Sequence, residues 1–330
     1  MSISVRNARR EDAEAAAEVL NEHSRRLHGV ADTTPAELEE DWRAPEFDFP
    51  ADVFVAESDG VLVGYADAIV WGDTSWLDVR GTDEAGYDPL LAAVVERAAA
   101  QGKANVRGWA NQDDRLLHEA YARARFEPIR HSFRMEVGLK GELPEPSWPE
   151  GFAVRPLQEG DERRVYRAQM DAFADTWGFT EAPFETWSHW ALGEHFQPEH
   201  WFVVESGDDV AAIAECRVPE AEPEMGWVDI LGVPPAYRRR GLATALLQHV
   251  FRHFAARGLE KVGLSVDAEN PTGAVRLYER AGMHVARTDV RYQLVRGRGV
   301  NPMVSTGQLR RTPGGARRPD GDTASGVSEE

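Results

Sequence analysis

The chain has 330 residues, 42% of them hydrophobic and 28% charged, and this globular composition excludes a protein that is disordered throughout. Its 37 basic and 56 acidic side chains give a net charge of −19, which argues against a general nucleic-acid binder, because such proteins need a basic surface. No segment reaches the roughly 18 consecutive apolar residues of a membrane span, and the N-terminus lacks a secretory signal. The single cysteine, Cys216, excludes an intrachain disulfide, and the scattered histidines indicate no metal site. We therefore expect a cytoplasmic protein without a metal.

The first 140 residues contain the elements of one domain. A strand-like start at Val5-Arg6 leads into a helix, and Glu57–Val61 is typical of a hairpin turn between two apolar runs. The segment Val79–Leu91 joins a strand to a helix, and a later helix carries Tyr121. Prolines cluster in the segment 141–150 and cannot continue a helix or a central strand, so this segment is predicted to be a linker.

The segment 151–296 repeats this order of elements, which indicates a duplication. A strand and helix begin at Val154-Arg155, a hairpin turn follows at Glu205–Val210, and the last helix carries Tyr278. Each half is predicted as strand, helix, hairpin, strand, helix, strand, helix, strand. This order implies a mixed, mostly antiparallel sheet with helices on both faces, so the fold class is α/β (α+β) with two tandem domains. The segment 297–330 is rich in Gly, Pro, Ser, Thr and Arg and is predicted to be a disordered tail.

The most informative segment is Gly226–Thr244, where a strand runs into an arginine–glycine turn and then into a long helix. Arg238–Arg240 place three cations, in an otherwise acidic chain, at a helix N-terminus whose free N–H groups favour phosphate. Gly241 and Ala243 keep the turn free of bulk, so phosphate oxygens can reach these amides. The pattern lacks the Lys-Ser/Thr of a P-loop and the glycine spacing of a dinucleotide-binding unit. It therefore predicts a phosphate site of another kind.

Two motifs of this half resemble those of the GCN5-related N-acetyltransferases (the GNAT superfamily). Val233–Ala243 resembles the acyl-CoA pyrophosphate motif, Arg/Gln-x-x-Gly-x-Gly/Ala. Leu264–Met283 resembles the second motif, a strand followed by Asn-x-x-x-Ala-x-x-x-Tyr-x-x-x-Gly-Phe, with Met283 in place of the phenylalanine. The resemblance covers the second half well and the first half weakly. It implies two tandem GNAT domains, residues 1–140 and 151–296, in a layout that resembles the mycothiol synthases.

The resemblance implies acetyl-CoA as co-substrate and a role for each motif residue. The backbone of a splayed strand would pair with the pantetheine arm, the arginine–glycine loop would hold the pyrophosphate, and Asn270 would contact the thiol end. Tyr278 would protonate the departing thiolate; the alternative is a tyrosine that only packs on the core. The implied cofactor-binding residues are Leu231, Gly232, Val233, Arg238, Arg239, Arg240, Gly241, Leu242, Ala243, Thr244 and Asn270.

An attacking amine must first lose a proton, because a free amine has a pKa of about 10. Many relatives place a glutamate for this purpose on the strand before the turn, where this chain has Trp227. Asp229 is on the same strand, two residues further along and therefore on the same face, and is our candidate base. Glu215, on the neighbouring strand, is the second candidate, and either could be an ordinary polar residue.

The corresponding loop of the first half, within Val79–Leu91, is two residues shorter and holds three acidic residues against one arginine. Acidic side chains disfavour a pyrophosphate, so this half is predicted to be a degenerate copy. A different feature precedes the motifs of the second half, where aromatic residues crowd Phe173–Phe202. They could be core packing, or a pocket that accepts an aromatic group or an amine cation.

We therefore expect an acetyl-CoA-dependent N-acetyltransferase that acts on a small, cationic amine in its C-terminal domain. An acidic protein attracts such a cation, and Trp227 departs from the pattern of the mycothiol synthases. Two alternatives stay open: a non-catalytic acyl-CoA-binding regulatory protein of the same fold, and a mycothiol-synthase-like enzyme. We expect no nucleic acid or membrane among the partners, and a monomer or a homodimer.

Overall fold

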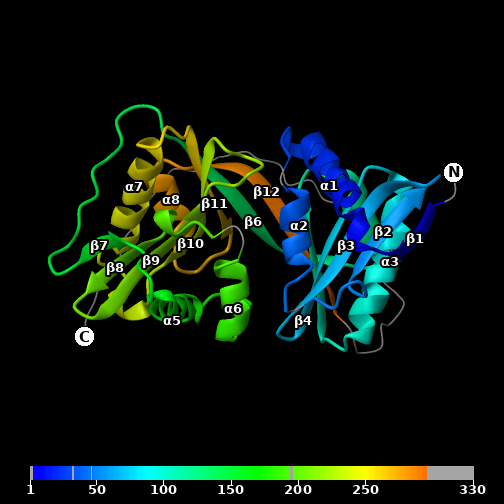
Figure 1. Ribbon diagram of the computed structural model, residues 1–330, viewed down its shortest axis with the longest axis horizontal. Coiled ribbons are helices and arrows are strands. Elements are labelled where there is room, and N and C mark those ends of the chain that lie inside the picture. The colour runs from blue at the N-terminus through cyan, green and yellow to red at the C-terminus, as the bar shows by residue number, and fades with distance from the viewer. Residues whose placement is uncertain (1–2, 32, 46, 194–195, 296–330) are drawn as a thin grey trace, which may run out of the picture. The chain divides into compact units, whose positions relative to one another are not determined.

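A computed structural model describes residues 3–31, 33–45, 47–193 and 196–295 (Figure 1). The predicted tail, 297–330, lies outside these residues. No helix in the described part of the chain is long and apolar enough to cross a membrane.

The first half contains a helical layer, an antiparallel meander and a parallel strand added through a helix. Its elements are β1 (Ile3–Asn7), η1 (Arg10–Asp12), α1 (Ala13–His28), α2 (Pro35–Asp41), β2 (Val53–Ser58), β3 (Val61–Trp71), β4 (Thr74–Gly81), α3 (Glu84–Ala100), β5 (Asn105–Asn111), α4 (Arg115–Arg123) and β6 (Glu127–Gly138).

The second half repeats this order, as the sequence predicts. Its elements are β7 (Ala153–Pro156), α5 (Glu162–Phe173), α6 (Phe184–Ala191), η2 (Pro198–His200), β8 (Phe202–Ser206), β9 (Asp209–Arg217), β10 (Met225–Gly232), η3 (Pro235–Tyr237), α7 (Leu242–Ala255), β11 (Lys261–Asp267), α8 (Ala274–Arg280) and β12 (His284–Val295).

The strands form one 12-stranded sheet in the order β1-β2-β3-β4-β5-β12-β6-β11-β10-β9-β8-β7. The β4–β5 and β10–β11 pairs are parallel and the other pairs are antiparallel, which confirms the predicted mixed, mostly antiparallel sheet. The last strands of the two halves are exchanged: β12 pairs with β5 of the first half, and β6 pairs with β11 of the second. Figure 1 shows β6 and β12 side by side between the halves. We propose 1–140 and 151–296 as the domains, each completed by a strand of the other.

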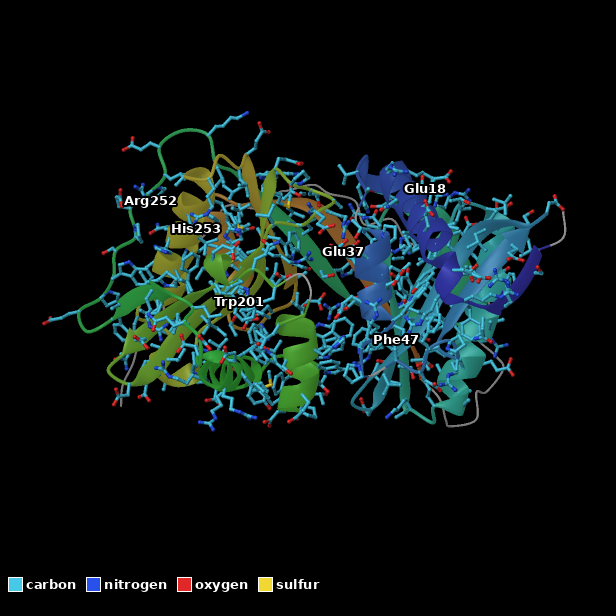
Figure 2. The ribbon with its side chains drawn as sticks, viewed as in Figure 1. Glu18, Glu37, Phe47, Trp201, Arg252 and His253 are labelled. Carbon is cyan, nitrogen blue, oxygen red and sulfur yellow. The ribbon has the colours of Figure 1, made fainter. Side chains whose placement is uncertain are left out.

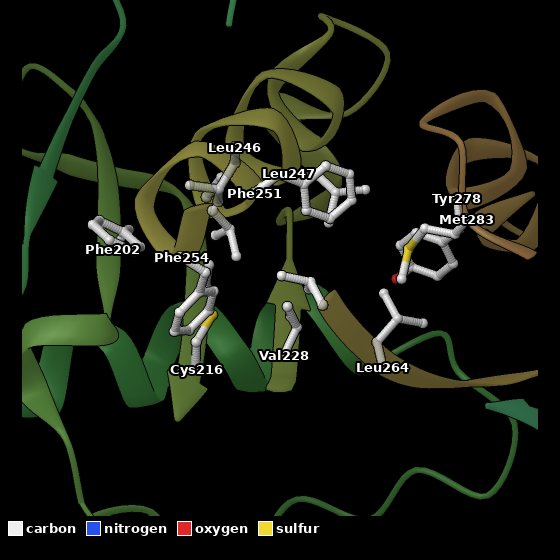
Figure 3. Close-up of a cluster of buried hydrophobic side chains, with 14 of the residues drawn as sticks. Phe202, Cys216, Val228, Leu246, Leu247, Phe251, Phe254, Leu264, Tyr278 and Met283 are labelled. Carbon is white, nitrogen blue, oxygen red and sulfur yellow. The ribbon is translucent and has the colours of Figure 1, made fainter. Parts of the chain in front are cut away.

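Apolar side chains cover both faces of the sheet in the second half. Leu246, Val250 and Phe254 of α7 recur at helical spacing and pack on the sheet together with Cys216 (Figure 3). The ring of Phe254 occupies the position where a side chain at Gly226 would lie, so only glycine fits there. On the opposite face, α5 and α6 pack on β8 and β9. The sheet thereby holds the loops at the carboxyl ends of β10 and β11 in fixed positions.

Candidate active site

The turn between β10 and α7 has the backbone geometry of an anion site. Arg239 and Gly241 both have positive φ angles, 64° and 86°, and Gly241 is the N-cap of α7 without a side-chain hydrogen bond to the helix. A left-handed turn followed by a helix N-terminus turns successive N–H groups in one direction, which favours phosphate oxygens. Nothing lies within 4 Å of a Cβ added at Gly241, so the approach to these N–H groups is open.

The three arginines of this turn do different things. Arg238 donates to both carboxylate oxygens of Asp175 and, at 2.9 Å, to the carbonyl of Ala172, so its charge is already paired with the end of α5. Arg240 donates at 3.2 Å to the carbonyl of Ala236, and its guanidinium does not line the cavity described below. Arg239 lines that cavity. The sequence treats the three cations as equivalent. In the structure, Arg238 and Arg239 line the cavity, and of these two only Arg238 is paired with a carboxylate among the described residues.

β10 and β11 separate beyond Val228 and Leu264, where their parallel pairing ends. A cavity of about 570 Å³ extends from the arginine–glycine turn into this opening. This arrangement suits acetyl-CoA, because the N–H groups of the turn can receive its phosphates and the free edge of β10 can pair with its amide-bearing arm. Of the residues that the sequence singled out, the cavity is lined by Asp229, Leu231, Val233, Arg238, Arg239, Gly241, Leu242, Ala243, Thr244, Asn270 and Tyr278.

Gly232 and Asn270 have structural roles that sequence reasoning missed. A Cβ added at Gly232 would lie 3.2 Å from the side chains of Ala172 and Ile213, so this glycine allows α5 to pack closely on the sheet. The Asn270 side-chain oxygen accepts a hydrogen bond from the backbone N–H of Thr272 at 2.9 Å, which shapes the turn before α8. Asn270 therefore borders the cavity at a turn that it also stabilises.

Tyr278 reaches from α8 towards Leu264 of β11 (Figure 3). Its side chain is buried, and burial raises the pKa of its phenol to about 12. The hydroxyl is therefore protonated at neutral pH and can donate a proton into the cavity.

Asp229 occupies a β-bulge between β10 and β9, since the register shifts between Val228 and Ile230. A bulge turns a side chain out of the regular alternation of the strand. The Asp229 carboxylate accepts from the Nε of Arg217 at 3.3–3.4 Å and is 39% exposed within a cleft. Desolvation in this cleft raises its pKa, and the Arg217 charge opposes the increase.

Glu215 lies beside Asp229, on the neighbouring strand β9. The side chain is 3% exposed, and its Oε1 atom has no hydrogen-bond partner among the described residues. Burial and the negative charge of Asp229 raise the pKa of Glu215 well above its usual value. Its surroundings therefore favour the protonated form of Glu215 beside the Asp229 carboxyl group.

A second cavity, of about 670 Å³, meets the first at Phe173 and Asp229, which line both. It contains carboxyl groups from both halves: Glu37 and Asp41 on α2 of the first half, and Glu215 and Asp229 of the second (Figure 2 labels Glu37). Burial in the cleft and the charge of Glu37 raise the pKa of Asp41 to about 7. Arg217 lies between the two halves, 3.7 Å from Glu37 and 3.3 Å from Asp229.

The aromatic residues before β8 form the wall of this second cavity and also pack as core. Trp187 and Trp201 are 5% and 6% exposed, belong to the hydrophobic cluster under α5 and α6, and line the cavity. The same side chains are therefore core and cavity lining, and the prediction that this cavity accepts an aromatic group or an amine cation stays a prediction. The aromatic residues that line this cavity are Trp71, Phe173, Phe179, Trp187, Trp190, Phe196 and Trp201.

The corresponding place in the first half is closed. The carboxylate of Asp83 caps α3 by accepting from the N–H of Ala85 at 2.8 Å, and the strand and helix are joined by residues 82 and 83 alone. The buried Tyr87 donates to the carbonyl of Gly81 at 3.1 Å. The hydroxyl of Tyr121, the counterpart of Tyr278, lies against Gly108 of β5. A cavity of about 40 Å³ lies nearby, between α1 and the ends of β4 and β5, but it does not reach the start of α3.

Comparisons with known proteins agree with this geometry. The model of the Acetyltransferase (GNAT) family matches residues 163–283. A protein of Kineococcus radiotolerans named mycothiol acetyltransferase is 34% identical over 72% of this chain and 80% of its own length. A GCN5-related N-acetyltransferase from Sphaerobacter thermophilus superposes with a TM-score of 0.73 at 27% identity, over 90% of this chain and 97% of that one. A tandem GNAT protein from the clavulanic acid biosynthesis pathway shares the fold, with a TM-score of 0.68 at 13% identity, over 91% of this chain and 100% of that one.

Proposed function

The chain belongs to the GNAT family of acetyltransferases, which use acetyl-CoA as co-substrate, and we propose that it N-acetylates a small, positively charged amine in its second half. One observation carries this proposal: the cavity suited to acetyl-CoA and the acidic, aromatic cavity meet at Asp229. An amine cation is stabilised by carboxylates and by aromatic rings, and both are gathered on one side of Asp229.

The cofactor contacts follow from the geometry of the second half. The N–H groups at the start of α7 and the side chain of Arg239 hold the pyrophosphate, and β10 pairs with the pantetheine arm beyond its bulge. Arg238 acts indirectly, because its bonds to Asp175 and Ala172 fix the turn against α5. Asn270 and Tyr278 border the cavity on the side of α8.

The two proton transfers are assigned to Asp229 and Tyr278. Acetyl-CoA supplies a thioester, whose carbonyl carbon bonds to the amine nitrogen as the carbon–sulfur bond breaks. Asp229 accepts the proton of the incoming ammonium group, and its raised pKa makes it a stronger base than an exposed aspartate. The Arg217 charge favours the ionised form of this carboxyl group, while burial favours the protonated form of Glu215. Tyr278 donates a proton to the departing sulfur, and the second proton that the nitrogen loses as the amide forms restores the Tyr278 hydroxyl.

The name of the relatives supports a second candidate, the mycothiol acetyltransferase activity itself, since 34% identity extends over both halves of the chain. Under this alternative the amine is the desacetyl form of mycothiol. A further alternative is a protein of this fold that binds acyl-CoA without turnover.

The test is an acceptor screen with the purified protein, acetyl-CoA, pooled amines and desacetyl-mycothiol. Release of free thiol reports turnover, and mass spectrometry identifies the acetylated product. We expect a product acetylated on a nitrogen that is cationic in solution. Products acetylated only on hydroxyl groups or on uncharged nitrogens contradict the proposal, and binding of acetyl-CoA without any thiol release favours the regulatory alternative.

A further inference from the structure

Three arginines from three strands surround the ring of Trp177, next to the cofactor cavity. The guanidinium carbons of Arg107 on β5, Arg130 on β6 and Arg291 on β12 lie 4.8, 4.6 and 5.9 Å from that ring. Because β12 and β6 are the exchanged strands, this cluster is assembled only where the two halves meet. Its position therefore depends on the tandem arrangement.

The cations of this cluster are only partly neutralised. Arg130 forms an ion pair with Asp267 at 2.9 Å. Arg107 hydrogen-bonds the neutral side chain of Gln293 at 2.8 Å, and Arg291 has the rings of Trp76 and Trp177 as its neighbours. Among the described residues, neither Arg107 nor Arg291 forms an ion pair. Burial lowers the pKa of both groups, which is the sign of cations held where water solvates them poorly.

Such an arrangement costs free energy, because a desolvated cation without a counter-charge is unfavourable. Arg130 shows that the same sheet face can place an aspartate beside an arginine. Asp267, Asp289 and Glu269 act on Arg291 through their charges, but none of them forms a direct ion pair with it among the described residues. Arg291 lines the cofactor cavity together with Trp177, Asp229 and Tyr278. Its guanidinium can therefore still form a direct pair with an anionic ligand in that cavity.

Asp229 lies where two cavities of different charge meet. The acidic cavity contains Glu37, Asp41 and Glu215, whereas the cofactor cavity contains Arg291 together with Asp267. A molecule with an amine and an acidic group at its two ends matches both cavities at once. A simple amine leaves Arg291 without a direct anionic partner.

On the premise of the proposed function, we infer that the acceptor carries a carboxylate or phosphate group in addition to its amine, and that Arg291, supported by Arg107, binds this anion beside the acetyl-transfer site. The guanidinium fork binds such oxyanions through two parallel hydrogen bonds. The anion also fixes which amine of the acceptor reaches Asp229, so Arg291 acts as a specificity-determining residue.

The test compares ω-amino acids of two to six carbons with their amides, and O-phosphoethanolamine with ethanolamine, as acceptors for acetyl-CoA. Each pair shares the amine and differs in the anion. We expect kcat/KM for the anionic member to exceed that of its partner by at least about tenfold, since charge-assisted contacts have this strength. Equal turnover of both members overturns the inference and leaves the proposed function standing. Turnover of no amine, including those of the acceptor screen, removes the proposed function and the inference with it.

The variant R291M tests the residue itself. It should abolish the preference for the anionic member by raising its KM, with little change for the amide, and R291K should retain part of the preference. R107M provides a second variant at the same cluster. The melting temperature of R291M shows whether the variant is folded, and we expect it to stay close to that of the unmodified protein, because Arg291 forms no direct ion pair among the described residues. A preference that survives in folded R291M contradicts the assignment.

The matched control is R287Q, on the same strand. Arg287 is paired with Asp289 at 3.3 Å and lines neither the cofactor cavity nor the acidic cavity. The preference for the anionic acceptor should therefore be unchanged in R287Q. A second set of assays varies the acyl donor: it compares succinyl-CoA with acetyl-CoA, using an acceptor amine that has no acidic group. A preference for succinyl-CoA that disappears in R291M would place the anion on the acyl donor and overturn the assignment to the acceptor.

Discussion

The two halves begin their central helices in opposite ways. In the second half, the N-cap residue of α7 is Gly241, which has no side chain, and a cavity of about 570 Å³ opens in front of it. In the first half, the carboxylate of Asp83 caps α3, and none of the described cavities reaches the start of this helix. A helix N-terminus attracts an anion, and in the first half the protein's own side chain is that anion. On our proposal, one carboxylate and a shorter connection thus separate the cofactor site from a structural helix start.

The first half nevertheless retains the acidic face that lies opposite its partner. Asp67 and Asp78 face each other on β3 and β4, and burial together with the charge of Asp78 raises the pKa of Asp67 well above its usual value. Glu215 and Asp229 are a similar carboxyl pair on β9 and β10. The first half therefore lacks the open turn that we propose holds the cofactor, while Glu37, Glu40 and Asp41 of its α2 helix line the cavity that both halves form.

The largest expected effect is a loss of turnover when Tyr278 is changed, but not when its first-half counterpart Tyr121 is changed. The variant Y278F keeps the ring that packs on the core and removes the proposed proton donor, so we expect turnover to fall by about 10²-fold with little change in acetyl-CoA affinity. The matched variant is Y121F, whose hydroxyl is enclosed against β5 and should not affect turnover. Steady-state kinetics of both variants measure the difference. If Y121F is the variant that loses turnover, the active half is misassigned.

The next effect distinguishes the arginines of the α7 turn. Replacing Arg239 by glutamate places a negative charge in the cofactor cavity and should weaken acetyl-CoA binding by more than about tenfold. The same change at Arg240, whose guanidinium folds back on Ala236, should have a smaller effect. Calorimetric titration of both variants tests the order. A larger loss for R240E would show that the bound turn differs from the turn described here.

A smaller effect concerns Asp41, the first-half residue in the acceptor cavity. Its pKa of about 7 means that the carboxyl group is neutral below this pH and charged above it. The KM for a cationic acceptor should therefore fall as the pH rises through 7, by up to about fivefold for an accessible charge pair. D41N should abolish this change. The exposed Asp88, paired with Arg123, provides the control D88N, whose pH profile should match the unmodified protein.

The smallest effect tests the helix cap of the first half. Replacing Asp83 by alanine removes the hydrogen bond to Ala85 and should lower the free energy of unfolding by about 1 kcal/mol. The affinity for acetyl-CoA should not change, because the cap lies at the closed site. Chemical denaturation and calorimetry measure the two quantities. New binding of acetyl-CoA by the first half would mean that Asp83 alone blocks a site that is otherwise intact.

Local patterns predicted the order of the elements and the phosphate turn. Helical spacing identified α7, and Gly241 in its arginine-rich turn indicated the anion site, because both depend on residues close together in the chain. The contacts between distant residues had no such local signal. Asp175, which binds Arg238, lies in the distant turn after α5, so the sequence could not separate Arg238 from Arg239.

The sequence also could not predict the exchange of β6 and β12 or the arginine cluster around Trp177. An antiparallel strand is indicated by its own residues, whereas its neighbours in the sheet depend on the whole fold. The bulge at Asp229 adds one residue to β10 and is visible only in the strand register. Asp229 was therefore predicted as a candidate base, while its position between two cavities was not.

The number of acetyl-CoA molecules bound per chain tests most directly the claim that only the second half holds the cofactor. Isothermal titration calorimetry of the full chain should give one site per chain, and this site should be lost or weakened in R239E and unchanged in D83A. Two equivalent sites per chain, or one site that persists unchanged in R239E, would contradict the account.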